Sequence, residues 1–129
     1  TGAALSEIEV DLKSSEMGRA LLDIVETHRE EMIQLINHTR PVTVAWHRNQ
    51  GPAYVAAFVR SAKHEDYRVP ETIEGISVST LLSTMADILL EHGSEALQTS
   101  ILAYRSSVMD WAERYRTAPE FVAAINRST

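Results

Sequence analysis

Residues 94–116, with the sequence SEALQTSILAYRSSVMDWAERYR, contain the pattern that decides the fold. Large apolar and aromatic side chains recur there at alternating intervals of four and three residues, at Leu97, Ile101, Tyr104, Val108, Trp111 and Tyr115. This spacing places them on one face of a helix and is typical of helices that cross at a shallow angle in bundles and coiled coils. We therefore predict one long helix that begins at Ser94.

Two further stretches show the helical period. They are residues 15–38, with Met17, Leu21, Ile24, His28, Met32 and Leu35, and residues 77–92, with Val78, Leu81, Leu82, Met85, Ile88 and Leu89. Serines precede both stretches as N-caps, and a proline after the first and a glycine after the second mark where they end. Shorter helices are expected at about 41–49, at about 52–64 and after Thr117, whereas residues 65–76 are expected to form one long loop.

Two segments allow more than one interpretation. In residues 5–10, Ser6 and Glu9 fit a capping box with Leu5 and Val10 as its hydrophobic staple, but apolar and acidic residues also alternate there as in a strand. Residues 42–44 are all β-branched, yet a strand there would have no partner to pair with. The sequence thus predicts an all-α fold, an irregular bundle of five to seven helices framed by residues 15–38, 77–92 and 94–116.

Composition limits the class of protein. A chain of 129 residues is expected to form a single compact helical domain over residues 1–129. It has no cysteine, and its longest apolar run, residues 54–59, is far too short to cross a membrane, so a cytoplasmic location without membrane contact is expected. A start at Thr1-Gly2 without methionine is what a processed product or a fragment of a longer chain would show.

The charge is unevenly distributed. Residues 37–68 carry five Arg or Lys against two acids, while the flanking segments are acidic and the whole chain has a net charge of −6. That net charge argues against nucleic-acid binding, which is driven by phosphate neutralisation. There is no glycine-rich phosphate loop, nucleophile elbow or His-Glu-x-x-His motif, so no cofactor is predicted and enzymatic activity is left open.

The basic segment also contains the candidate site, residues 40–54, RPVTVAWHRNQGPAY. On a functional interpretation Trp46 and Tyr54 form an apolar wall, Arg48 binds an anion through its forked donors, and His47 moves a proton. On a structural interpretation, which base rates favour, Trp46 is a core anchor and His47 and Arg48 lie on a solvated face. In either case we expect Gly51-Pro52 to form a sharp turn, and if φ at Gly51 is positive, Gly51→Ala should destabilise the fold, whereas a negative φ predicts the opposite sign.

Histidine 28 interrupts the apolar stripe of residues 15–38. It is either a buried histidine bonded to a neighbour, which is the commoner case, or an additional group of the candidate site. A metal site would need three or more of His28, Glu31, His38, His47, His64 and His92 to converge, and none is predicted.

Two functions follow from these observations. The first is a non-catalytic interaction or regulatory module that binds a protein partner or self-associates through the seam from Leu97 to Tyr115. The alternative is a protein or enzyme that binds an anionic small molecule at Trp46, His47, Arg48, His28 and Tyr54. The sequence specifies neither the partner nor the ligand.

Overall fold

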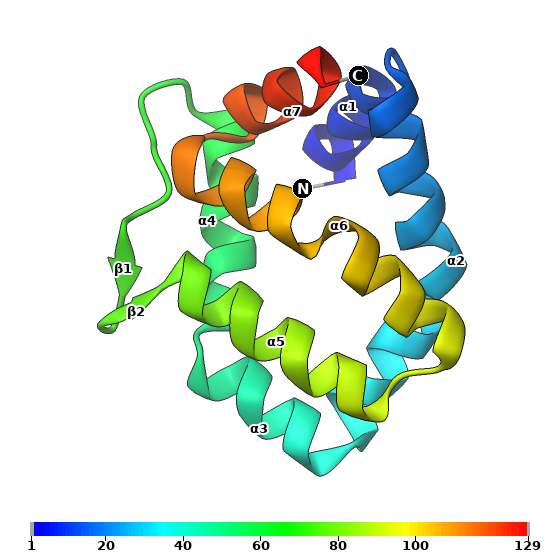
Figure 1. Ribbon diagram of the computed structural model, residues 1–129. Helices are drawn as coiled ribbons and strands as arrows, with labels where there is room; N and C mark the ends of the chain where they lie inside the picture. The colour runs from blue at the N-terminus through cyan, green and yellow to red at the C-terminus, as the bar shows by residue number, and fades with distance from the viewer. Residues whose placement is uncertain (1, 129) are drawn as a thin grey trace.

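The computed structural model describes residues 2–128, with side chains from Ser6 onward, and contains seven helices within that range (Figure 1). They are α1 (Gly2–Leu12), α2 (Glu16–His38), α3 (Arg40–Arg48), α4 (Gly51–Lys63), α5 (Val78–His92), α6 (Glu95–Arg114) and α7 (Ala118–Arg127). The predicted all-α bundle is confirmed. Within residues 2–128, no helix combines the length and the apolar character needed to cross a membrane.

Capping residues set the start of four helices, as the sequence predicted. In each case a side-chain oxygen accepts a hydrogen bond from a backbone N–H in the first turn: Ser15 from Gly18, Ser77 from Thr80, Ser94 from Leu97 and Thr117 from Glu120. These bonds satisfy donors that have no partner within the helix. Helix boundaries were therefore predictable wherever a hydroxyl residue preceded an apolar stripe.

The first segment is a helix rather than a strand, but its predicted capping box is wrong. Helix α1 begins at Gly2, so Ser6 lies inside the helix and cannot cap it. The proposed staple involves Leu5, whose side chain lies outside the described part of the chain. Helix α1 ends at the buried Leu12, next to α7, where the amide of Asn126 donates to the Asp11 carbonyl at 3.0 Å.

The stretch from 65 to 76 is only partly a loop. It contains a small antiparallel hairpin, β1 (Thr72–Ile73) and β2 (Ile76–Ser77). The two residues between the strands, Glu74 and Gly75, have φ of 49° and 77°, which suits the tight turn of a two-residue hairpin. The hydroxyl of Tyr54 donates to the Ile76 carbonyl at 2.6 Å and fixes the hairpin to α4.

The helices pack as a ring around a central space. Helix α3 contacts α4, α4 contacts α7, α7 contacts α6, α6 contacts α5, and α5 returns to α3. Helix α2 runs along the ring from α3 to α7, and α1 packs against α2, α4 and α7. In Figure 1, α1 and α7 lie at one end of the molecule and α3 and α5 at the other.

Each end of the molecule has its own hydrophobic core. One consists of Val42, Ala45, Tyr54, Leu81, Met85 and Leu89, from α3, α4 and α5. The other consists of Leu12, Trp111, Val122, Ala124 and Ile125, from α1, α6 and α7. Because the apolar burial is concentrated at the two ends, the helices that connect them leave space between the cores.

Candidate functional site

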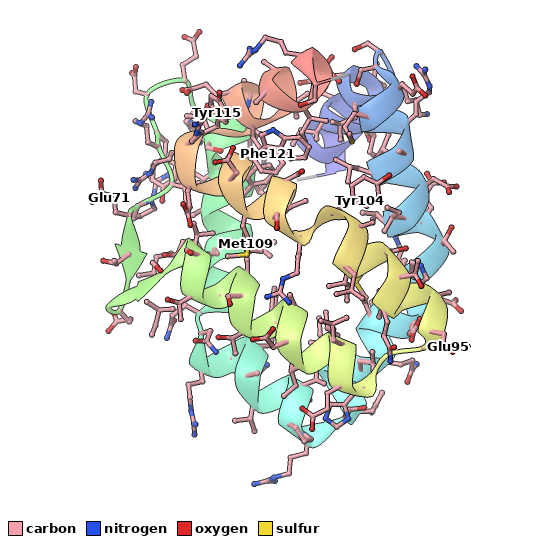
Figure 2. The ribbon with its side chains drawn as sticks, in the orientation of Figure 1. Glu71, Glu95, Tyr104, Met109, Tyr115 and Phe121 are labelled. Carbon is pink, nitrogen blue, oxygen red and sulfur yellow. The ribbon has the colours of Figure 1, made fainter. Side chains whose placement is uncertain are left out.

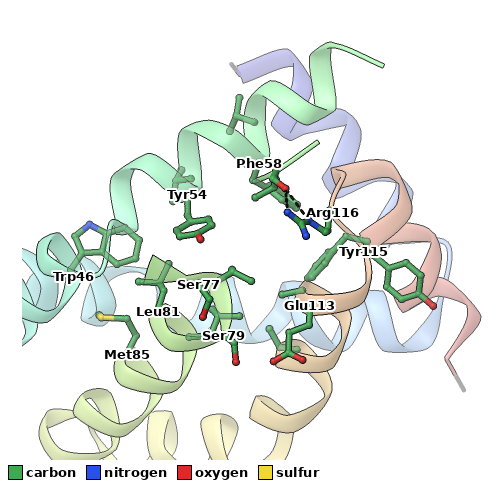
Figure 3. Close-up of a pocket in the computed structure, with 18 of the residues that line it drawn as sticks. Trp46, Tyr54, Phe58, Ser77, Ser79, Leu81, Met85, Glu113, Tyr115 and Arg116 are labelled. Carbon is green, nitrogen blue, oxygen red and sulfur yellow. Dashed lines mark hydrogen bonds between the residues drawn. The ribbon is translucent and has the colours of Figure 1, made fainter. Parts of the chain in front are cut away.

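A cavity of about 750 Å³ occupies the space between the two cores (Figure 3). Side chains from α2, α3, α4, α5, α6 and α7, together with the loop before the hairpin, line it, and most of them are apolar. Its size and character match those of pockets that bind small organic molecules, which are mainly apolar with a few placed polar groups.

Aromatic side chains form much of the cavity wall. They are Trp46, Tyr54, Phe58, Tyr115 and Phe121, five of the chain's eight aromatic residues. The rings of Phe58 and Phe121 meet edge to face with centroids 5.6 Å apart, which fixes α4 against α7. Figure 2 shows Tyr115 and Phe121 near the junction of α6 and α7.

The structure divides the five predicted site residues among three places. Trp46 and Tyr54 line the cavity, where burial raises the pKa of the Tyr54 hydroxyl. His47 and Arg48 are exposed on α3 and do not line the cavity. His28 is buried in α2 but is also absent from the cavity wall. The five residues are thus not brought together in one site.

Trp46 is held in place by an unusual neighbour, Gly51. A Cβ atom at position 51 would lie 2.3 Å from Cδ2 and Cε3 of the indole, so only glycine fits beneath the ring. The residue with the left-handed conformation at this turn is Gln50, with φ of 64°, and φ at Gly51 is not positive. Gly51 is the first residue of α4, and its role is to allow close packing rather than an unusual backbone angle.

Arg116 fixes the loop at one end of the cavity. Its Nε and Nη2 donate to the Val69 carbonyl at 2.9 and 2.7 Å, and the Val69 N–H donates to the Arg116 carbonyl at 2.7 Å. The Nη1 atom of Arg116 also lies 3.2 Å from Oε1 of Glu71. The charge of this arginine is therefore already neutralised by a partner.

A few polar groups also line the cavity. In Figure 3, Ser79 and Glu113 lie across the cavity from Trp46 and Phe58, whereas Ser77 lies near Tyr54. The Ser77 hydroxyl is engaged with Thr80, as the N-cap of α5. Glu113 takes part in none of the ion pairs within residues 6–128, which leaves its carboxylate available to a ligand.

Part of the cavity lining is exposed to solvent on α2 and α4, and this part is here called the mouth of the cavity. Three of its lining residues are large apolar side chains that remain exposed: Val25 by 44%, Ile33 by 49% and Val55 by 52%. Arg29 lies one helical turn from both Val25 and Ile33, so these three residues share one face of α2. The mouth is thus an apolar rim with one cation.

His28 is surrounded by polar groups that join α2 to α6. Its Nε2 lies 3.4 Å from the Ser100 hydroxyl and its Nδ1 lies 3.4 Å from Oε1 of Glu31. Glu31 in turn accepts hydrogen bonds from the backbone N–H of Ser94 at 2.6 Å and from its hydroxyl at 2.8 Å, which lower the pKa of Glu31. These contacts join α2 to the start of α6 and match the interpretation of His28 as a buried histidine bonded to its neighbours.

The remaining candidates give no metal site. The other four histidines are exposed, and within residues 2–128 no group of three or more His, Asp or Glu side chains is positioned to hold an ion. The seam of α6 faces the inside of the molecule, with Leu97 and Trp111 buried and its other four members partly buried.

Several cavity residues carried no signal in the sequence. Ser79, Glu113 and Arg116 lie in ordinary helical or junction positions, and no motif distinguishes them. Periodicity shows which face of a helix turns inward but does not show whether the space there is filled. Comparison of the chain with protein-family models, with curated proteins and with solved structures found no match.

Proposed function

We propose that the protein binds an apolar small molecule in the central cavity without transforming it. One observation carries the proposal: a cavity of about 750 Å³ with a wall of aromatic and aliphatic side chains. Ordered proteins fill their interiors closely, so a space of this size is favoured when a ligand occupies it. Binding without catalysis is favoured because the buried histidine, His28, lies outside the cavity wall.

Fluorescence titration with N-phenyl-1-naphthylamine, a neutral apolar probe, tests the proposal. We expect saturable binding of one probe per chain. Ala112 lines the cavity from α6, so Ala112→Phe should fill part of the space and weaken binding by at least about tenfold, or about 1.4 kcal/mol. Ala103→Phe is the matched control, because Ala103 is exposed on the same helix and does not line the cavity.

The variants should keep a melting temperature close to that of the parent, since Ala112→Phe adds a side chain to open space. Absence of saturable binding, or equal binding by both variants and the parent, would count against the cavity as a ligand site. A loss of binding confined to Ala112→Phe supports it.

A second candidate function is self-association through the mouth of the cavity. The exposed Val25, Ile33 and Val55 favour it, because all three line the cavity and leave apolar surface open to solvent, as interaction sites do. Sedimentation velocity of Ile33→Ser over a range of concentrations is the test. Leu102→Ser is the control, because Leu102 is exposed by 65% and does not line the cavity. A monomer at every concentration in the parent protein would exclude this candidate.

A further inference from the structure

The cavity wall is suited to one class of ligand by its aromatic content. Trp46, Tyr54, Phe58 and Phe121 all line it, and the faces of aromatic rings carry a negative electrostatic potential. The wall therefore favours a ligand with an apolar, carbon-rich body, and the charged groups outside the aromatic wall decide which charge the ligand carries.

The charged residues that line the cavity determine which charge a ligand can carry. Four charged residues line it: Arg29, Glu71, Glu113 and Arg116. Arg116 and Glu71 neutralise each other at 3.2 Å, and Arg116 also donates to the Val69 carbonyl. Two charges are left for a ligand, the carboxylate of Glu113 and the guanidinium of Arg29.

Arg29 is a poor receptor for an anion in its setting. Glu26 lies one helical turn before it and is exposed on the same face of α2. An anion at Arg29 would meet this acid, and the chain's net charge of −6 opposes its approach.

Glu113 has a better setting. It lies on the same side of the cavity as the Ser79 hydroxyl, opposite the aromatic wall (Figure 3). Its neighbour Arg114 is paired with Asp110 at 3.3 Å, so it is not the partner of Glu113. A carboxylate and a hydroxyl together can accept the hydrogen bonds of a protonated amine.

We propose, on the basis of the proposed function, that the ligand is an organic cation whose apolar body fills the cavity and whose ammonium group binds Glu113 and Ser79. The negative charge of the whole chain attracts such a ligand to the site. The apolar wall excludes simple metal cations, which need several oxygen ligands, and selects for a carbon body.

Three probes that share one ring system and differ only in the head group test this proposal. They are 1-naphthylmethylamine, 1-naphthylmethanol and 1-naphthoic acid, measured by isothermal titration calorimetry at neutral pH. We expect the amine to bind up to about fivefold more tightly than the alcohol, because Glu113 is exposed and an ion pair with an exposed carboxylate contributes up to about 1 kcal/mol. The acid should bind most weakly.

Glu113→Gln should lower the affinity for the amine to that for the alcohol and leave the affinity for the alcohol unchanged. Glu91→Gln is the matched control, since Glu91 is exposed on α5 and does not line the cavity. Ser79→Ala should weaken the amine by a smaller factor. Because Glu113 is exposed and has no ion-pair partner within residues 6–128, its substitution should leave the melting temperature unchanged.

The outcomes separate the two proposals. If the alcohol binds as tightly as the amine, or if Glu113→Gln keeps the preference for the amine, the cavity binds apolar molecules but the cation inference is wrong. Tighter binding of the acid would also overturn it and would make Arg29 the receptor. If none of the three probes binds, the proposed function itself fails.

Discussion

Substitution of Gly51 by alanine should destabilise the protein because of one contact, with the indole of Trp46. The added Cβ would lie 2.3 Å from two ring carbons, whereas carbon atoms normally approach to about 3.5–4.0 Å. The ring or the start of α4 would have to move by about 1 Å. Overpacking of this kind costs about 1–3 kcal/mol.

The higher helix propensity of alanine offsets part of this destabilisation, because alanine stabilises a helix relative to glycine by up to about 1 kcal/mol. We therefore expect Gly51→Ala to lower the free energy of unfolding by about 1–2 kcal/mol. For a domain of this length the melting temperature should fall by roughly 4–8 °C. Urea denaturation and thermal melts followed by circular dichroism measure both quantities.

A double-mutant cycle identifies the cause. In a Trp46→Leu background the ring is gone, so Gly51→Ala should be neutral or slightly stabilising. Gly75→Ala provides the contrast, because Gly75 has φ of 77° and a Cβ there would meet no atom within 4 Å. Gly75→Ala should lower the free energy of unfolding through backbone strain alone, and by the same amount in both backgrounds. Equal destabilisation by Gly51→Ala with and without Trp46 would refute the reasoning.

Three further substitutions test contacts between elements. Ser61→Ala should lower the free energy of unfolding by about 2 kcal/mol in urea titrations. The buried Ser61 hydroxyl accepts a hydrogen bond from the Ala118 N–H at 2.9 Å, and the substitution would leave that donor without a partner. Substitution of the exposed Ser106 by alanine is the control. Glu31→Gln should cost about 1 kcal/mol at neutral pH, since the Glu31 carboxylate stabilises the start of α6 through Ser94. Because the folded-state pKa of Glu31 is lowered, that contribution is present above pH about 4.5 and is lost as the pH falls through the folded-state pKa, so parent and variant should converge in acid. Tyr54→Phe should cost about 1 kcal/mol and speed amide exchange in the hairpin; unchanged exchange would contradict the anchoring role of the hydroxyl.

The helical frame was predictable because its signals are local. A capping hydroxyl, an apolar stripe and a closing proline or glycine all lie in or next to a single helix. Helix α6 shows the first two signals, the cap at Ser94 and the seam that follows it. The hairpin at 72–77 was missed because strands of two residues are too short to show alternation. Its one clue was the Glu74-Gly75 pair between β-branched residues.

The site was harder to predict because it depends on contacts between distant segments. Trp46 and Tyr54 could be selected as aromatic residues near a turn, and both line the cavity. His47 and Arg48 were selected for their chemistry, but they follow Trp46 on α3 and lie on its exposed face. Glu113 became a candidate only when the ring of helices placed it opposite the aromatic wall.

The separation of the two cores has a consequence for how this protein can change. Met32, Val59, Leu82 and Ala112 line the cavity but belong to neither core nor to the side chains packed against them. Substitutions at these four positions can alter the shape of the cavity while the two cores stay intact. Part of the cavity wall is thus formed by residues outside the cores, and selection or an engineer can reshape the cavity there without eroding thermodynamic stability.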